Sequence, residues 1–245
     1  MKYTYSKTFN LSYTELDKKA GLNAINAITI VQDVMTEYFE SFRSDNLRIK
    51  KNNRALWVMT KTKVVFKDEQ ATWLDRICAS GYTIKNTPIR SYVECIVKKD
   101  GNRTLFVANQ EYCVIDLNTR KLRKINTIDY PSDMEYENTA QEISFSKLDT
   151  EFSEKEFVYN QKVFYPDIDF SEHTNNVSYM KYIFNTFDSD FFNKNKITEI
   201  ELHYIHESYE SDLLSVYKKA NENHVDFLIK CGKQEILRAR MFLAK

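Results

Sequence analysis

The spacing of apolar residues divides the first half of the chain into one helix and several strands. A crude alternation of polar and apolar side chains opens it, and a stretch with apolar residues at helical intervals follows. The predicted elements are a strand at 3–14, a helix at 16–42 and strands at 56–66, 73–83, 90–98 and 104–116. Asp100-Gly101-Asn102 separates the last two and is typical of a tight hairpin turn, so these strands are expected to form an antiparallel meander.

The second half of the chain repeats this order. Its predicted elements are a strand at 157–164, a helix at 177–187 and strands at 197–207, 212–220, 225–230 and 234–243. Setting Asp17 against Asp169 brings the starts of the two helices into register and places Gly21 opposite His173. The pattern therefore predicts an internal duplication in which only the second copy keeps this ionisable side chain.

Periodicity fails between the two copies, at about residues 126–152, where Pro, Ser, Asn, Thr and many acidic residues are mixed. This composition favours a linker, although a surface excursion within one domain would have much the same composition. With a linker there, the chain has a first unit at 1–125 and a second unit at 153–245. Each unit belongs to the α+β class, with one long helix covered by an antiparallel sheet.

A polar loop precedes the second helix and carries the clearest candidate chemistry. It combines carboxylates, a hydroxyl and an imidazole in Asp167, Asp169, Ser171, Glu172 and His173, and cap-type residues follow in Asn175, Asn176 and Ser178. The first backbone N–H groups of a helix lack internal partners, so they can polarise a carbonyl beside a group that handles a proton. A lone His at a helix start is nevertheless more often a capping or solvated residue than a catalytic one.

Residues 169–179 have the sequence D-F-S-E-H-T-N-N-V-S-Y, and His206-Glu207-Ser208 with Asp212 follows downstream. These two motifs resemble those of the acyl-acyl-carrier-protein (acyl-ACP) thioesterases and, less fully, those of related thioester hydrolases of the hotdog fold. The first is similar to the D-x-N-x-H-V-N-N-V-x-Y signature, with Ser171 in place of Asn and Thr174 in place of Val. The second is similar to an R-E-C segment followed by Asp, with Ser at the Cys position. The matching positions of the first motif are Asp169, His173, Asn175, Asn176, Val177 and Tyr179.

The resemblance implies a fold and an activity. The fold would be a double hotdog, with two tandem units that each wrap a curved antiparallel sheet around a long helix. The activity would be hydrolysis of fatty acyl-ACP thioesters to free fatty acid and holo-ACP, as part of fatty acid biosynthesis. An acyl-CoA thioesterase is a close alternative, because the motif residues would act on the thioester group and not on the carrier. Since Ser171 and Gly21 depart from an active pattern, a non-catalytic sensor of acyl thioesters is the alternative outside enzymes.

The resemblance also assigns roles to residues. Glu207 falls on the catalytic Glu and would activate water as a general base, directly or through His173, although nucleophilic attack by Glu207 stays open. Asp169 would fix the loop or the His tautomer, and Ser171 offers a shorter hydroxyl where the family has an amide. The backbone amides of Asn175, Asn176 and Val177 would hold the thioester oxygen. Candidates for the lining of the acyl pocket, in the first unit, are Met35, Phe39 and Trp57.

Composition removes several other classes. The 35 basic and 35 acidic residues leave no net field for nucleic acid or a membrane surface. The 4 Cys form no C-x-x-C pair and lie in or beside strand-like apolar segments, so we expect buried free thiols and neither a disulfide framework nor a metal site. We expect no cofactor. A metal at His203-x-x-His206 with Glu207 is disfavoured, because strand positions three apart face opposite sides.

The ends and the apolar runs of the chain bear on its location. The first ten residues carry no apolar leader, and no apolar run approaches the roughly 20 residues that a membrane span requires. We therefore expect a cytoplasmic protein. Its oligomeric state stays open between a monomer and a homodimer, because pairing of two internal units permits the first and exposed sheet edges permit the second.

Overall fold

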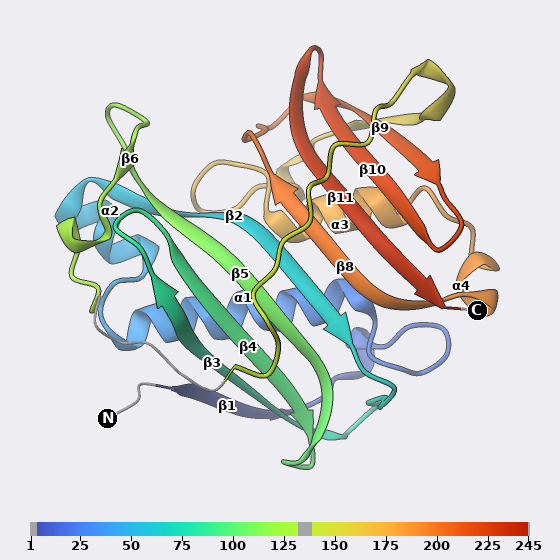
Figure 1. The fold of residues 1–245 in the computed structure, drawn as a ribbon, viewed down its shortest axis with the longest axis horizontal. Helices are drawn as coiled ribbons and strands as arrows, with labels where there is room; N and C mark the ends of the chain where they lie inside the picture. The colour runs from blue at the N-terminus through green and yellow to red at the C-terminus, as the bar shows by residue number, and fades with distance from the viewer. Residues whose placement is uncertain (1–3, 132–138, 245) are drawn as a thin grey trace. The chain divides into compact units, whose positions relative to one another are not determined.

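The computed structural model describes residues 4–131 and 139–244, and the chain divides into two compact units, Met1–Ser144 and Phe145–Lys245. Residues 132–138 of the predicted linker lie outside the described residues. Each unit combines an antiparallel sheet with one principal helix (Figure 1). Among the described residues, no helix is long and apolar enough to cross a membrane.

The first unit packs helix α1 (Ala24–Ser41) against a sheet with the strand order β1-β3-β4-β5-β2. Its other elements are β1 (Tyr5–Asn10), η1 (Tyr13–Glu15), α2 (Asn46–Asn53), β2 (Ala55–Phe66), β3 (Arg76–Asn86), β4 (Ser91–Lys99), β5 (Arg103–Asp116), β6 (Leu122–Arg123) and η2 (Ile125–Thr127). The short β6 pairs with β5. All four of the predicted main strands are present, each within three residues of its predicted ends.

Helix α1 begins eight residues after its predicted start at residue 16. The Asn23 side chain accepts a hydrogen bond from the N–H of Asn26 and caps the helix, while the preceding residues form a turn closed by the Asp17 N–H and the Gly21 carbonyl oxygen. Helix α2 was missed because it is short and polar, with Ile49 as its one buried residue. A helix of this kind shows no apolar stripe in the sequence.

The core of the first unit lies between α1 and the sheet. Eight side chains of α1 are buried, which agrees with a broad apolar stripe. Gly81 on β3 allows the helix to approach closely, because a Cβ atom there would lie 2.7 Å from Met35 Sδ. Further along the helix, the ring of Phe39 stacks on Trp57 with a centroid distance of 5.0 Å. The close backbone approach and the large rings together fill this core.

The second unit has the strand order β8-β11-β10-β9-β7 and one helix, α3 (Asn176–Phe184), against it. Its other elements are η3 (Glu154–Glu156), β7 (Phe157–Lys162), η4 (Tyr165–Asp167), α4 (Phe191–Lys194), β8 (Lys196–Tyr204), β9 (Leu213–Ala220), β10 (His224–Cys231) and β11 (Gln234–Ala244). Helix α3 stops before its predicted end at Phe187, whose ring stacks instead on Phe191. Strand β8 ends at Tyr204, so Glu207 lies in the following loop and not on a strand.

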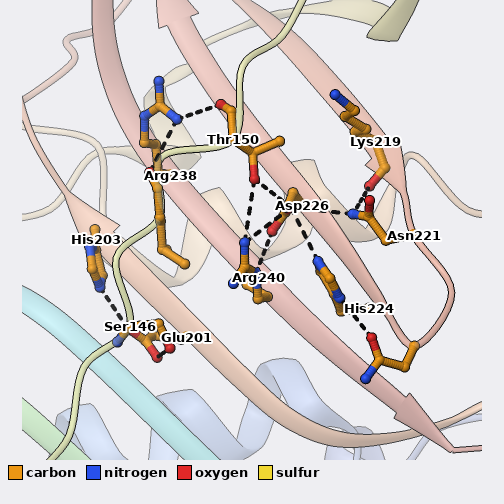
Figure 2. Close-up of polar contacts among 12 residues, drawn as sticks. Ser146, Thr150, Glu201, His203, Lys219, Asn221, His224, Asp226, Arg238 and Arg240 are labelled. Carbon is orange, nitrogen blue, oxygen red and sulfur yellow. Dashed lines mark hydrogen bonds and ion pairs between the residues drawn. The ribbon is translucent and has the colours of Figure 1, made fainter.

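An extended segment, residues 145–152, crosses the sheet of the second unit on the face opposite α3 (Figure 1). Ser146 donates hydrogen bonds to Glu201 on β8 from its backbone N–H and its hydroxyl, at 2.7 and 3.0 Å. Thr150 donates from its hydroxyl to Asp226 on β10 (Figure 2). Both carboxylates are almost completely buried, so the segment is held to the sheet by hydrogen bonds to buried acidic side chains.

The four cysteines are free, and the predicted burial holds for two of them. Cys95 and Cys113 are buried in the first unit, whereas Cys78 and Cys231 are half-buried. Burial raises the pKa of the Cys113 thiol to about 11 and raises the pKa of Cys95 as well. A thiol in such surroundings stays protonated and unreactive at neutral pH.

Candidate functional site

The loop before each principal helix has the same backbone design in both units. Asp17 N–H donates to the Gly21 carbonyl oxygen at 2.8 Å, and Asp169 N–H donates to the His173 carbonyl oxygen at 2.9 Å. The residue preceding Gly21 or His173 has a positive φ in both copies, 60° at Ala20 and 68° at Glu172. These contacts confirm the predicted alignment of Asp17 with Asp169.

A second loop contacts this one in each unit, and again the backbone bonds match. Leu22 N–H donates to the Ala71 carbonyl oxygen at 2.8 Å in the first unit, and Thr174 N–H donates to the Ser208 carbonyl oxygen at 2.8 Å in the second. The correspondence of Ala71 with Ser208 makes Gln70 the counterpart of Glu207. The first unit therefore carries Gly21 and Gln70 where the second carries an imidazole and a carboxylate.

His173 and Glu207 face each other across these two loops. His173 Nε2 lies 3.2 Å from Glu207 Oε2, and the two side chains are 17% and 28% exposed. The pair is thus within hydrogen-bond reach and still accessible from solvent. An imidazole and a carboxylate at this distance can share a proton and activate a water molecule.

Tyr209 borders the pair on its exposed side. Its ring lies 5.1 Å from the imidazole of His173, and its hydroxyl lies 3.4 Å from Glu207 Oε2. Sequence reasoning missed this residue. The only available signal was its position two residues after Glu207, and the sequence does not say on which side of the loop its ring falls.

Three buried hydroxyls lie behind the pair. Ser208 Oγ lies 2.7 Å from Thr174 Oγ1 and 2.9 Å from the Tyr179 hydroxyl, and the Thr174 hydroxyl also contacts the Ser208 carbonyl oxygen at 3.1 Å. Burial raises the pKa of Tyr179, so its hydroxyl stays protonated and available as a donor. We call Thr174, Ser208 and Tyr179 the hydroxyl network.

The start of α3 offers fewer free amides than the sequence predicted. Asn175 N–H donates to the Asp167 carbonyl oxygen at 2.7 Å, and Val177 N–H donates to the Asn175 side chain at 2.9 Å. Asn176 N–H, at the first helical position, finds no acceptor among the residues that the structure describes. Of the three amides, the one at Asn176 is the donor that remains for a bound oxygen.

Asp169 and Ser171 shape the loop and contact each other. Asp169 Oδ1 accepts a hydrogen bond from the Ser171 backbone N–H at 2.8 Å, and Asp17 accepts the equivalent bond from Lys19 in the first unit. Because the same turn forms in a unit without the imidazole, this contact serves the backbone conformation. The Ser171 hydroxyl has no hydrogen-bond partner within the described part of the chain.

The three residues predicted to line an acyl pocket all belong to the first unit and are buried there. Met35 packs against Gly81, and Phe39 and Trp57 form an aromatic cluster with Tyr112 and Tyr130. The indole Nε1 of Trp57 donates to the Ser44 carbonyl oxygen at 2.9 Å. Phe39 and Trp57 therefore lie in one aromatic cluster of the first unit, and Met35 lies against β3.

The two histidines of the second motif region have different partners. His203 Nε2 lies 2.7 Å from Glu201 Oε1, beneath the segment at residues 145–152 (Figure 2). His206 Nδ1 lies 2.8 Å from the Glu235 carbonyl oxygen. Across residues 4–131 and 139–244 there is no group of three or more His, Cys, Asp or Glu side chains that could hold a metal ion.

Comparison with known families agrees with the motifs. Residues 146–240 match the family model of the acyl-ACP thioesterase C-terminal domain, a stretch that contains His173, Glu207 and the hydroxyl network. No curated protein matches the sequence. The resemblance inferred from the two motifs is thereby confirmed.

Solved structures with a similar fold cover almost the entire chain. An acyl-ACP thioesterase from Bacteroides thetaiotaomicron has a TM-score of 0.87 at 17% identity, with 99% of this chain and 98% of that chain covered. A 12:0-ACP thioesterase from Umbellularia californica has a TM-score of 0.82 at 17% identity, with 99% and 94% covered. At identities this low, the similarity shows the fold alone, and the fold of these structures agrees with the predicted hotdog class.

Proposed function

We propose that the chain is a member of the acyl-ACP thioesterase family, whose C-terminal domain model matches residues 146–240, and that it hydrolyses fatty acyl-ACP thioesters to free fatty acid and holo-ACP. The observation that carries this proposal is the 3.2 Å approach of His173 Nε2 to Glu207 Oε2 at the start of α3. This contact places a proton acceptor beside the N-terminal end of α3, which can stabilise negative charge.

The proposed reaction uses water as the nucleophile. Glu207, directly or through His173, removes a proton from a water molecule while the oxygen of that water bonds to the carbonyl carbon of the thioester. The tetrahedral intermediate then collapses, the bond from carbon to sulfur breaks, and the departing thiolate receives the proton. The products are a carboxylic acid and the free thiol of the carrier, so atoms and charges balance without a cofactor.

The oxyanion of the intermediate would be held by the N–H of Asn176. This amide stands at the first position of α3, where the aligned peptide dipoles act as about half a positive charge. Asn175 supports it, because its side chain caps the helix and its own N–H is held by Asp167. Asp169 and Ser171 would keep the loop in the conformation that presents His173.

We also propose that the two units, Met1–Ser144 and Phe145–Lys245, form a double hotdog. The equivalent loop contacts at Asp17 and Asp169 support a duplicated hotdog module. In this arrangement Met35, Phe39 and Trp57 of the first unit would line the acyl pocket.

Thiol release from matched acyl-ACP and acyl-CoA substrates of graded length tests the function. The wild type should hydrolyse acyl-ACP faster than acyl-CoA, and Glu207→Gln should lower kcat by about 100-fold or more. Glu210→Gln, three residues away on an exposed side chain, is the matched control and should leave the rate unchanged. An undiminished rate in Glu207→Gln would remove this carboxylate from the mechanism.

The same assay separates the alternatives. Preference for CoA substrates would make the protein an acyl-CoA thioesterase, and binding of acyl thioesters without turnover in the wild type would make it a sensor. Mass spectrometry of the enzyme quenched during turnover distinguishes the two roles of Glu207. An acyl adduct on Glu207 would establish nucleophilic attack, whereas general-base catalysis leaves the protein unmodified.

A further inference from the structure

The hydroxyl network joins the two loops that carry His173 and Glu207. Thr174 follows His173 directly, and Ser208 follows Glu207 directly. Thr174 donates to the Ser208 carbonyl oxygen from its backbone N–H at 2.8 Å and from its hydroxyl at 3.1 Å, and the two hydroxyls lie 2.7 Å apart. Any relative shift of the loops that separates the ionisable pair would also stretch these bonds.

Tyr179 ties the same network to the helix. Its hydroxyl lies 2.9 Å from Ser208 Oγ, and its side chain is buried on α3, three residues after Asn176. The network thus connects three parts of the proposed site: the loop of the imidazole, the loop of the carboxylate, and the helix that presents the free amide. Because Ser208 is 0% exposed, solvent does not compete for these hydrogen bonds.

The first unit provides an internal comparison. It forms the same backbone hydrogen bond between its loops, yet the positions equivalent to Thr174, Ser208 and Tyr179 hold Leu22, Ala71 and Ala27. The fold of this loop pair therefore forms without hydroxyls. The unit that lacks the imidazole and the carboxylate also lacks the hydroxyl network. The network therefore accompanies the ionisable pair and is not needed for this loop pair to fold.

We infer that Thr174, Ser208 and Tyr179 are positioning residues that hold His173 and Glu207 in register with each other and with the start of α3. This inference rests on the proposed thioester hydrolysis. Buried hydroxyls lower stability unless they are hydrogen-bonded, and a fully bonded group of them fixes one arrangement of the chains that carry it. Misplacement of reacting groups by about 1 Å can lower a rate by 100-fold.

Three near-isosteric substitutions each remove one hydroxyl: Thr174→Val, Ser208→Ala and Tyr179→Phe. Each should lower kcat by about tenfold with little change in KM, because substrate binding is retained while the alignment of the pair is relaxed. Thr174→Ser keeps the hydroxyl and should restore most of the rate. The double variant Thr174→Val/Ser208→Ala should lose less than the product of the two single losses, since both changes break the same link.

Thr186→Val is the matched control. The Thr186 side chain is also buried in the second unit and donates to the Ile183 carbonyl oxygen at 2.8 Å, but it lies just beyond the opposite end of α3. Its loss should lower the unfolding temperature about as much as Thr174→Val does and leave kcat unchanged. If Thr174→Val and Thr186→Val reduce kcat equally, the network is merely structural and the inference is wrong.

Crystal structures of the wild type and Thr174→Val separate this inference from the proposed function. A wild type that hydrolyses no thioester would refute the function, whatever the variants do. The distance from His173 Nε2 to Glu207 Oε2 should still increase in Thr174→Val, because the network acts on geometry. An unchanged distance together with an unchanged kcat in an active enzyme would overturn the positioning role alone.

Discussion

Gly21 and Gln70 approach each other in the first unit as His173 and Glu207 do in the second. A Cβ atom on Gly21 would lie 3.0 Å from Gln70 Oε1, and the imidazole of His173 lies 3.2 Å from the carboxylate of Glu207. Both contacts join the two loops that the matched backbone bonds hold together. The first unit thus has the same arrangement of loops, with a glycine and an amide in place of the imidazole and the carboxylate.

Gly21→Ala should therefore be tolerated. The contacting Gln70 amide is the end of an exposed, flexible side chain, and alanine reduces the conformational freedom of the unfolded chain. We expect the free energy of unfolding to change by less than about 1 kcal/mol in urea titrations. Gly81→Ala is the contrasting variant, because its Cβ would lie 2.7 Å from Met35 Sδ in the core, and it should destabilise by about 2 kcal/mol.

Asn175→Ala and Asn23→Ala remove equivalent caps with different consequences. Each asparagine caps the principal helix of its unit, through Val177 N–H in one case and Asn26 N–H in the other. Both variants should lower the free energy of unfolding by about 1 kcal/mol. Only Asn175→Ala should also lower kcat, because Asn175 adjoins the proposed oxyanion donor; equal kcat values for the two variants would argue against that donor.

Asp226 should contribute to stability in a pH-dependent way. Burial by itself would raise the pKa of Asp226, but hydrogen bonds from Arg240 and Thr150 outweigh it and hold that pKa below its usual range (Figure 2). A carboxylate with a lowered pKa stabilises the fold above its unfolded pKa of about 3.9, and this contribution is lost as the pH falls through the lower folded value.

Asp226→Asn should accordingly lower the free energy of unfolding at pH 7 by about 3 kcal/mol, because the half-buried guanidinium of Arg240 keeps its charge without its partner. The difference from the wild type should shrink below pH 4 in acid titrations followed by circular dichroism. Asp149→Asn, at an exposed position paired with Lys147, is the control and should change stability by less than about 0.5 kcal/mol. A constant difference at all pH values would contradict the assigned role of the charge.

The thiols should divide into two classes on alkylation. Iodoacetamide at pH 8 should modify Cys78 and Cys231 of the native protein, which are half-buried, and spare Cys95 and Cys113. Burial shields the spared thiols from the reagent and raises their pKa values; because the pKa of Cys231 is raised as well, access of the reagent decides the contrast. Peptide mass spectrometry would show the pattern, and modification of all four in urea would confirm that burial is its cause.

The elements of the fold were predictable where one apolar face recurs with a fixed period. The strand predicted at 56–66 is observed at Ala55–Phe66, a difference of one residue, because successive side chains of a strand alternate between its two faces and leave a regular pattern in the sequence. The start of α1 was placed too early, since the polar turn before Asn23 has a composition that a helix could also accommodate. Helix α2 was missed because only Ile49 marks a buried side.

At the site, the motif positions of His173 and Glu207 were identifiable from residue type and order, and their pairing was expected from the resemblance alone. The sequence could not show which of the three candidate amides is available to a ligand. Folding brings acceptors such as the Asp167 carbonyl oxygen close to them, and these acceptors occupy the N–H groups of Asn175 and Val177. Tyr209 and the partners of Ser208 were not predictable for the same reason.

The sequence by itself determined the duplicated order of elements, the α+β class and the polar loop that precedes the second helix, because these depend on short-range periodicity and composition. The tertiary structure decided which side chains meet: His173 with Glu207, and Ser208 with Thr174 and Tyr179. Those contacts join residues about thirty positions apart, and long-range distances follow from how the sheet and helix pack rather than from local pattern.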